Sequence, residues 1–180
     1  MNRSSLQKTR DLICFCAFTG LRYSDMAAHK RTDITSGFIN VITEKTDCTL
    51  KVPLNAYSRA ILQKYEDERY PGNLALPVIT NQKMNEYLKD LCDICGFNTP
   101  IKYSYYRGRV RYDEVYPKWQ LLGTHGARRT FICVSLELGI PTTVIQKITG
   151  HTNAAAMRPY IAITDKTIRE AMDLFSRRGG

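Results

Sequence analysis

The sequence predicts a mainly α-helical chain with a small antiparallel β-sheet, an α+β fold, in one domain spanning residues 1–180. Apolar residues recur at helical spacing along most of the chain, most clearly at residues 81–95. Two β-like runs, residues 38–43 and 49–54, are separated by a short polar segment and are typical of a hairpin. No internal repeat or linker-like stretch divides the chain.

In the first half of the chain, several residues are typical of helix starts and helix ends. Ser4 and Ser5 can cap the first helix, Gly20 interrupts the chain after it, Asn55 caps a third helix, and Gly96 closes the long amphipathic one. Pro71 and the glycine after it mark a loop. The expected elements are helices at residues 6–18 and 23–29, strands at 38–43 and 49–54 joined by a turn at 44–48, and helices from 56 to about 68 and at 81–95.

The second half begins with residues 100–119, where aromatic or apolar residues alternate with basic ones, which predicts a β-ribbon. Thr124 can cap the next helix, which runs to Leu138 and ends before Pro141. The remaining expected elements are helices at residues 142–149, 153–161 and 164–177.

Composition indicates an anionic partner. The formal net charge is +9, and 43% of the 180 residues are hydrophobic, enough for a core. DNA, RNA and an anionic membrane surface all fit this charge. No apolar run approaches the roughly 20 residues of a membrane span, and the polar opening lacks the apolar core of a signal peptide. We therefore expect a cytoplasmic chain that does not engage a membrane.

The six cysteines do not form a metal-binding pattern. Cys92 and Cys95 make one C-x-x-C, with no second pair and no matching histidine downstream. A zinc site needs those further ligands. We interpret the cysteines as buried free thiols and expect no metal site.

Two pairs of residues at i, i+3 spacing carry the first chemical signal. Arg22 and Asp25 would share a helix face, so the carboxylate can hold the guanidinium fork. Taken alone, this pair is more typical of a surface ion pair. His125 and Arg128 begin a helix that is otherwise apolar, and a buried charge there needs a phosphate or a carboxylate as its partner.

A second histidine and a late tyrosine complete the set. His151 follows Gly150, and Tyr160 lies nine residues later. Each alone is more often structural than catalytic. Two arginines, two histidines and a tyrosine, without a carboxylate cluster, suit a phosphodiester that cationic and neutral donors hold while a phenol oxygen attacks it.

The order of these residues closely resembles the tyrosine recombinases, the family of phage-type integrases. The resemblance covers essentially the whole chain and rests on three boxes: Phe18-Thr19-Gly20-Leu21-Arg22 with Asp25, Thr124-His125 with Ala127-Arg128 and Thr130-Phe131, and Thr149-Gly150-His151. It implies the catalytic-domain fold of that family. Two departures are Pro159 directly before Tyr160, and Arg129 where many relatives have histidine.

The resemblance also implies roles for the residues. Tyr160 would be the nucleophile, Asp25 would orient Arg22, and no metal, ATP or other cofactor would be needed. Family members place a catalytic lysine in a hairpin after the first box, for which Lys45 matches best and Lys51 is second. The implied catalytic set is Arg22, Lys45, His125, Arg128, His151 and Tyr160.

The implied activity is site-specific DNA recombination. Strands would be cleaved and rejoined through a 3′-phosphotyrosyl link, integrating or excising a mobile element. The alternative is a non-catalytic or decayed DNA-binding module. Expected partners are double-stranded DNA, other recombinase protomers in a tetrameric synapse with exchange of the helix at residues 164–177, and accessory DNA-bending proteins, in the bacterial cytoplasm at the nucleoid. Full-length relatives also carry an N-terminal DNA-binding domain, which we expect this chain to lack.

The basic ribbon leaves two interpretations open. Its cations can follow the DNA backbone, which gives affinity and salt dependence but little sequence information. Alternatively, it is a solvated ribbon whose tyrosines pack inward. The candidate DNA-binding residues are Lys102, Arg107, Arg109, Arg111 and Lys118.

Overall fold

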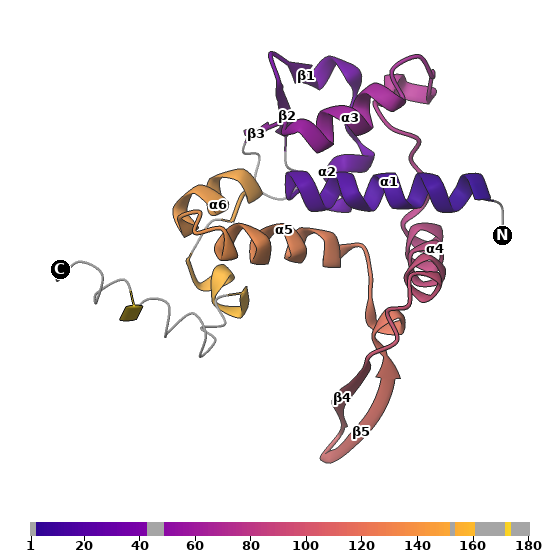
Figure 1. Ribbon diagram of the computed structural model, residues 1–180, viewed down its shortest axis with the longest axis vertical. Coiled ribbons are helices and arrows are strands. Elements are labelled where there is room, and N and C mark those ends of the chain that lie inside the picture. The colour runs from indigo at the N-terminus through magenta and orange to yellow at the C-terminus, as the bar shows by residue number, and fades with distance from the viewer. Residues whose placement is uncertain (1–2, 43–48, 152–153, 161–171, 174–180) are drawn as a thin grey trace.

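The computed structural model describes residues 3–42, 49–151, 154–160 and 172–173. A long helix, α1 (Arg3–Thr19), lies across the middle of the molecule (Figure 1). Three helices pack against it: α3 (Ala56–Lys64), α4 (Asn81–Ile94) and α5 (His125–Glu137). The fold is mainly helical, as the sequence predicts, and the other helices are arranged around α1.

The main hydrophobic core forms where α1 meets the short helix α2 (Tyr23–Ala27) and the small sheet. Leu12, Phe15 and Met26 are fully buried there. Each such side chain contributes about 1.5–3 kcal/mol when it is removed from water. This core fixes the end of α1, where the first sequence box lies.

A second, smaller cluster joins α5 to α6 (Thr142–Thr149) and to η4, the 3₁₀ helix Ala154–Tyr160. Its buried members are Ile132, Ile145 and Met157, and Tyr160 packs against them. This cluster holds the other two sequence boxes beside each other.

The small sheet has three antiparallel strands in the order β1–β2–β3. They are β1 (Ile34–Thr35), β2 (Phe38–Ile42) and β3 (Thr49–Pro53), and Ile39 pairs with Val52 at its centre. Burial alternates along β3, as expected for a strand with one face on the core. The hairpin strands are confirmed, β1 was not predicted, and the turn at residues 43–48, which carries Lys45, lies outside the described residues.

A two-stranded ribbon projects away from the helical body (Figure 1). It consists of β4 (Pro100–Arg107) and β5 (Val110–Pro117), paired in antiparallel register from Pro100–Pro117 to Arg107–Val110. Gly108 adopts a positive φ of 62° in the two-residue turn, which suits a tight hairpin. The ribbon leads into a 3₁₀ turn, η3 (Lys118–Leu121).

Several local predictions are confirmed. The Asn55 side chain accepts a hydrogen bond from the Ser58 amide at 3.0 Å and caps α3. Gly96 follows α4 with a φ of 76°, the left-handed geometry that ends a helix. Helix α6 spans the predicted residues. These three predictions rested on local signals in the sequence, and the structure bears each of them out.

Other boundaries were wrong because tertiary contacts decide them. Helix α3 stops at Lys64, four residues before the expected end, where the Arg31 guanidinium captures the carbonyls of Tyr65, Glu66 and Glu68. Thr124 does not cap α5, because its own backbone is already helical and its hydroxyl donates to the Asn81 side chain at 3.2 Å.

The two ends of the described chain also differ from the prediction. Helix α1 begins at Arg3, so Ser4 and Ser5 lie inside it and not at its cap. The helix expected at residues 153–161 is the 3₁₀ helix η4, which contains Pro159, a residue without an amide proton. The helix expected at residues 164–177 falls almost wholly outside the described residues. No helix in the described ranges is both long and apolar enough to cross a bilayer.

Candidate active site

The site begins where α1 gives way to α2. The Thr19 hydroxyl donates to the Phe15 carbonyl at 2.7 Å, and Gly20 then turns the chain with a φ of 72°. A Cβ at Gly20 would lie 2.6 Å from the Phe131 ring of α5. Only glycine meets both the backbone conformation and this close approach. The turn presents the Gly20 carbonyl toward α5 and places Arg22 at the start of α2.

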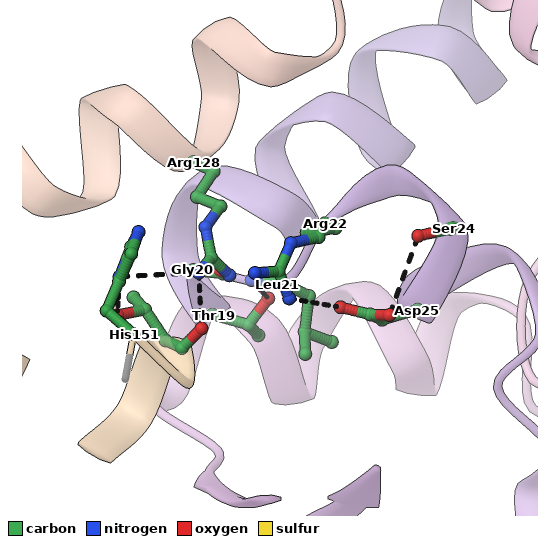
Figure 2. Close-up of polar contacts among 9 residues, drawn as sticks. Thr19, Gly20, Leu21, Arg22, Ser24, Asp25, Arg128 and His151 are labelled. Carbon is green, nitrogen blue, oxygen red and sulfur yellow. Dashed lines mark hydrogen bonds and ion pairs between the residues drawn. The ribbon is translucent and has the colours of Figure 1, made fainter. Parts of the chain in front are cut away.

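Arg128 of α5 lies behind this turn, and only 1% of it is exposed. Its guanidinium donates to the Gly20 carbonyl at 2.8 Å and to the Thr149 carbonyl (Figure 2). Burial, and then the charge of Arg22, lower the pKa of Arg128 to about 10, so it remains a cation at neutral pH. Among the described residues, no carboxylate forms an ion pair with it. Its charge is therefore held by neutral acceptors and is not cancelled by a paired carboxylate among the described residues.

Arg22 lies beside this buried cation and is more accessible, with 30% of its side chain exposed. It forms the predicted pair with Asp25, at 3.6 Å between Nη1 and Oδ2 (Figure 2). That distance is long for a direct hydrogen bond. The buried Oδ2 of Asp25 accepts no hydrogen bond among the described residues. The Asp25 carboxylate thus lies close to the Arg22 guanidinium without forming a bidentate pair with it.

His151 follows the end of α6, which closes at Gly150 with a φ of 67°. A Cβ at Gly150 would lie 2.8 Å from Leu50 of β3, so glycine lets the helix end pack on the sheet. The Nδ1 atom of His151 lies 2.7 Å from the Thr149 hydroxyl and 3.4 Å from Nη2 of Arg128. Burial, and then the nearby arginines, lower the pKa of His151 to about 4. The imidazole is neutral at pH 7.

His125 is the first residue of α5 and is exposed. Its ring is still partly shielded from water, and this partial burial, followed by the charges of Arg128, Arg129 and Arg22, lowers its pKa below 6.5. It is therefore within electrostatic reach of both site arginines and is uncharged at neutral pH.

Tyr160 is half-buried at the end of η4. Its ring centroid lies 6.4 Å from that of His151, and its phenol is near enough to influence the pKa of Arg128. The structure thus brings together five of the six residues expected to be catalytic, namely Arg22, His125, Arg128, His151 and Tyr160.

The hairpin lysines are not joined to this group by a described contact. Lys45 lies outside the described residues, so its role stays a prediction. Lys51 is exposed on β3, with its ammonium 4.8 Å above the centre of the Phe38 ring. That packing is consistent with a structural position for Lys51.

Thr149 is the residue whose part in the site the sequence did not reveal. It is fully buried, and it contacts Arg128 through its carbonyl and His151 through its hydroxyl. In the sequence, Thr149 was named only as a member of the third box, with Gly150 and His151, and was given no role of its own. The sequence gives no indication that Thr149 contacts both Arg128 and His151.

The ribbon cations are arranged differently. Lys102 and Arg111 both pair with the Asp113 carboxylate at 2.9 Å. The Arg107 guanidinium lies over the rings of Tyr105 and Tyr112, 5.4 and 5.6 Å from their centres. Of the two interpretations that the sequence left open, inward packing of the tyrosines does not describe Tyr103, Tyr106 and Tyr112, which are exposed.

Those rings stack along the ribbon itself. Tyr105 and Tyr112 are nearly parallel at 5.5 Å between centroids, and Tyr106 is 68% exposed. Arg109 is exposed in the ribbon turn, and Lys118 is exposed at its base. Unlike the other three members of the predicted DNA-binding set, these two cations form no ion pair or cation–π contact with another described side chain.

No group of three or more His, Cys, Asp or Glu side chains in the described ranges is placed to hold a metal ion. The described cysteines are free thiols. Burial raises the pKa of Cys16 to about 12, whereas Cys95 is exposed, contrary to the expectation that all are buried.

Comparison with known proteins identifies the family. The profile described as "Phage integrase family" matches residues 2–167, so the chain belongs to the phage integrase family. No curated protein matches the sequence significantly.

Solved structures of tyrosine recombinases and integrases share the fold. A crystal structure of XerA recombinase covers 97% of this chain at 18% identity and a TM-score of 0.65. The XerH site-specific recombinase bound to a palindromic difH substrate covers 98% at 19% identity and a TM-score of 0.70. The Tn1549 transposon integrase in complex with circular intermediate DNA covers 92% at 20% identity and a TM-score of 0.67. The chain spans 64%, 48% and 57% of the lengths of those three chains.

Proposed function

We propose that residues 1–180 form the catalytic domain of a site-specific DNA recombinase that cleaves and rejoins strands through a 3′-phosphotyrosyl link, integrating or excising a mobile element. The observation that carries the proposal is the buried Arg128. Its charge is fixed by two backbone carbonyls and has no carboxylate partner among the described residues. A charge held in this way would attract an anion, and Arg22 and Tyr160 are both near enough to Arg128 to influence its pKa, which supports a shared phosphate site.

The chemistry follows from the groups present. The Tyr160 oxygen would attack the phosphorus, forming a P–O bond as the bond to the 5′ oxygen breaks. A phenol has a pKa of about 10, so its proton must leave in step with the attack. The leaving 5′ oxygen would take up a proton from a charged group, for which Lys45 is the candidate, and the neutral His125 ring would accept the phenol proton.

The arginines would stabilise the charge that develops on the non-bridging oxygens. Arg128 is prearranged by Gly20 and Thr149, so it does not have to reorganise during the reaction. Arg22 is held less tightly, at 3.6 Å from Asp25, and can turn its fork to the phosphate. The phosphotyrosyl link conserves the bond energy, so the 5′-hydroxyl of another strand can reverse the step without ATP.

The proposed partners are double-stranded DNA and further recombinase protomers. The XerH and Tn1549 structures are DNA complexes, and a lambda integrase structure is a dimer on a core site. By analogy, this chain would act in a multimer on DNA, with DNA-bending proteins as accessory factors, at the bacterial nucleoid. Lys118 and Arg109, which pair with no described carboxylate, are the ribbon cations that would contact the backbone without first breaking an ion pair.

Covalent trapping tests the proposal. The chain is mixed with nicked suicide duplexes from the ends of its element, in the presence of a chelator, and denatured. We expect a protein–DNA adduct that is absent in Tyr160→Phe. Tyr87→Phe is the matched control, because Tyr87 is also half-buried but lies on α4, outside the site.

Each outcome has a distinct meaning. An adduct that persists in Tyr160→Phe assigns the nucleophile to another residue. Loss of the adduct in both variants indicates a general defect in folding. No adduct with the unaltered chain, even with a full-length relative's DNA-binding domain fused to it, would favour the non-catalytic alternative.

A further inference from the structure

The first turn of α5 is held by side chains of another helix. Figure 1 shows α4 beside the start of α5. The amide of Thr124, the residue before His125, donates to the Asn85 side-chain oxygen at 2.9 Å, and the Thr124 hydroxyl donates to the Asn81 side-chain oxygen at 3.2 Å. Because the Thr124 backbone is already helical, its amide is one of the donors that a helix start leaves without a partner in its own helix. Here α4 supplies the acceptor.

The Asn85 side chain suits this place because an amide group carries both a donor and an acceptor. Its oxygen accepts from the Thr124 amide, which can only donate, and its nitrogen donates at 2.8 Å to the Asn81 carbonyl, which can only accept. These two partners fix which way the amide group faces. The same nitrogen donates to the Asn81 side-chain oxygen at 3.1 Å. Aspartate would supply only the acceptor, and leucine would supply neither.

The α4 side of this contact is itself held in place. Met84, next to Asn85, is fully buried in the main core. On the α5 side, a Cβ at Gly123 would lie 3.0 Å from the Asn85 side-chain oxygen, so glycine permits the close approach of the two segments. The residue before His125 is thus bound to a helix whose position the core fixes.

Among the site residues, His125 depends most on this support. Arg128 and His151 are held by hydrogen bonds of their own side chains. His125 is exposed in the first turn of α5, so the backbone of that turn determines where its ring lies. A general base must come within about 2.6–3.2 Å of the group whose proton it takes. Fraying of one helical turn would remove this geometry without unfolding the domain.

We infer that Asn85 is a positioning residue, which fixes the first turn of α5 through Thr124 and thereby sets the direction in which His125 presents its ring to the site. The catalytic part of this inference rests on the proposed function, in which His125 accepts the Tyr160 proton. Asn85 acts through Thr124 and not on the reacting atoms themselves.

The pKa of His125 reports the position of its ring without DNA. Partial burial and the charges of the nearby arginines lower this pKa below 6.5. In Asn85→Leu, a released first turn would move the ring into water and away from those charges, so we expect the pKa to rise toward 6.5. NMR titration of the imidazole C–H resonances measures it, and a glutamine variant of each of the three histidines assigns them. His151 should titrate as in the unaltered chain.

Gln82→Leu is the matched control for this titration. Gln82 is another amide side chain on α4, but it donates to Glu86 of the same helix at 3.1 Å. Thr124→Val removes only the hydroxyl bond to Asn81 and should raise the pKa of His125 by less than Asn85→Leu does. The inference is overturned if neither Asn85→Leu nor Thr124→Val changes this pKa, or if Gln82→Leu raises it equally.

The adduct assay then separates positioning from stability. At saturating protein, where affinity for DNA no longer limits the rate, we expect Asn85→Leu to slow adduct formation by about 10–100-fold, because a displacement of about 1 Å at a reacting group can cost about 100-fold. Asn85→Asp, which keeps the acceptor for the Thr124 amide, should recover part of the rate. A lower urea midpoint in Asn85→Leu with an unchanged rate for the folded fraction would contradict the inference. If the unaltered chain forms no adduct while the titration result holds, the recombinase proposal fails and the support of His125 by Asn85 stands.

Discussion

The candidate site and the β4–β5 ribbon are both rich in cations, but different groups hold those cations. In the site, Arg128 is buried and bound by the carbonyls of Gly20 and Thr149. In the ribbon, Lys102 and Arg111 are exposed and bound by the carboxylate of Asp113. The site thus holds the Arg128 cation with neutral groups, which leave its charge unchanged. The ribbon pairs two of its cations with a carboxylate, which neutralises part of their charge.

This difference separates two uses of a basic residue. A carbonyl is neutral, so a cation bound to it keeps its full charge for a phosphate, and low local polarity strengthens that attraction. A carboxylate neutralises the cation it binds, so DNA must compete for it. A count of arginines and lysines in the sequence does not distinguish the two cases.

Replacing Arg128 should have the largest effect. Arg128→Ala leaves two buried carbonyls without donors and opens a cavity, so we expect a loss of about 3–5 kcal/mol in the free energy of unfolding. Urea denaturation followed by circular dichroism measures it. Arg129→Ala is the matched control, because this exposed neighbour should change stability by no more than about 0.5 kcal/mol. Similar losses in the two variants would mean that the carbonyl contacts do not hold the site together.

The next prediction compares a glycine from each region. Gly20 and Gly108 have positive φ values of 72° and 62°, so a change to alanine costs each about 1–2 kcal/mol in backbone strain. Only Gly20 would also place its Cβ against a ring, at 2.6 Å from Phe131, whereas nothing lies within 4 Å at Gly108. We expect Gly20→Ala to lose about 2–4 kcal/mol in total. Equal unfolding free energies for the two variants would remove the argument for close packing between α1 and α5.

Releasing the ribbon cations should have a smaller effect, on binding and not on stability. Asp113→Asn removes the carboxylate that holds Lys102 and Arg111. If the ribbon contacts DNA, the salt dependence of binding should steepen by about one to two counterions, with tighter binding at low salt. Fluorescence anisotropy over a range of salt concentrations measures the slope.

Asp93→Asn provides the control for that experiment. It makes the same charge change at an exposed position on α4. Identical slopes for the two variants would mean that net charge, and not the freed ribbon cations, changes the binding. Steeper binding in Asp113→Asn alone would identify the ribbon as a DNA contact.

The sequence predicted the fold best where a signal was local. The amphipathic pattern of α4, the Asn55 cap and the alternation in the ribbon each depend on a few neighbouring residues, and each was confirmed. The end of α3 depends on Arg31, more than thirty residues away in the chain, and the sequence did not reveal it. Contacts between distant residues override local propensity at such boundaries.

The same division applies to the candidate site. The i, i+3 spacing predicted that Arg22 and Asp25 would meet, and they do. The hydrogen bonds from Arg128 to the Gly20 and Thr149 carbonyls could not be predicted, because every residue has a backbone carbonyl and the residue type does not show which of them will accept. The ribbon pairing depends on register: Ser104 stands opposite Asp113, which brings Lys102 diagonally to the same carboxylate. A one-residue shift would have left those charges apart.

The smallest expected effect is a difference in how the two regions respond to acid. In the site, the pKa values of His125 and His151 are lowered below 6.5 by burial and by the arginines, that of His151 to about 4. The folded state then binds fewer protons than the unfolded state, so stability falls as the pH drops from about 6.5 toward 4.

In the ribbon, hydrogen bonds lower the pKa of Asp113, first from Ser104 and then from Lys102. The ionised Asp113 carboxylate therefore contributes its full stabilisation of the folded state at any pH above 3.8, its pKa in the unfolded chain. That stabilisation is lost only as the pH falls below 3.8.

Unfolding at pH 7.5, 6 and 5 therefore tests the site histidines, together with the buried His29, whose pKa burial also lowers, and leaves the ribbon unchanged. We expect the free energy of unfolding to decrease across this range, and His151→Gln to flatten the decrease, because glutamine does not titrate. Asp113→Asn should leave the slope as it is in the unaltered chain. A slope that His151→Gln does not alter would mean that this imidazole is as easily protonated in the folded chain as in the unfolded one. Such a result would contradict the neutral imidazole that burial and the two site arginines impose on His151.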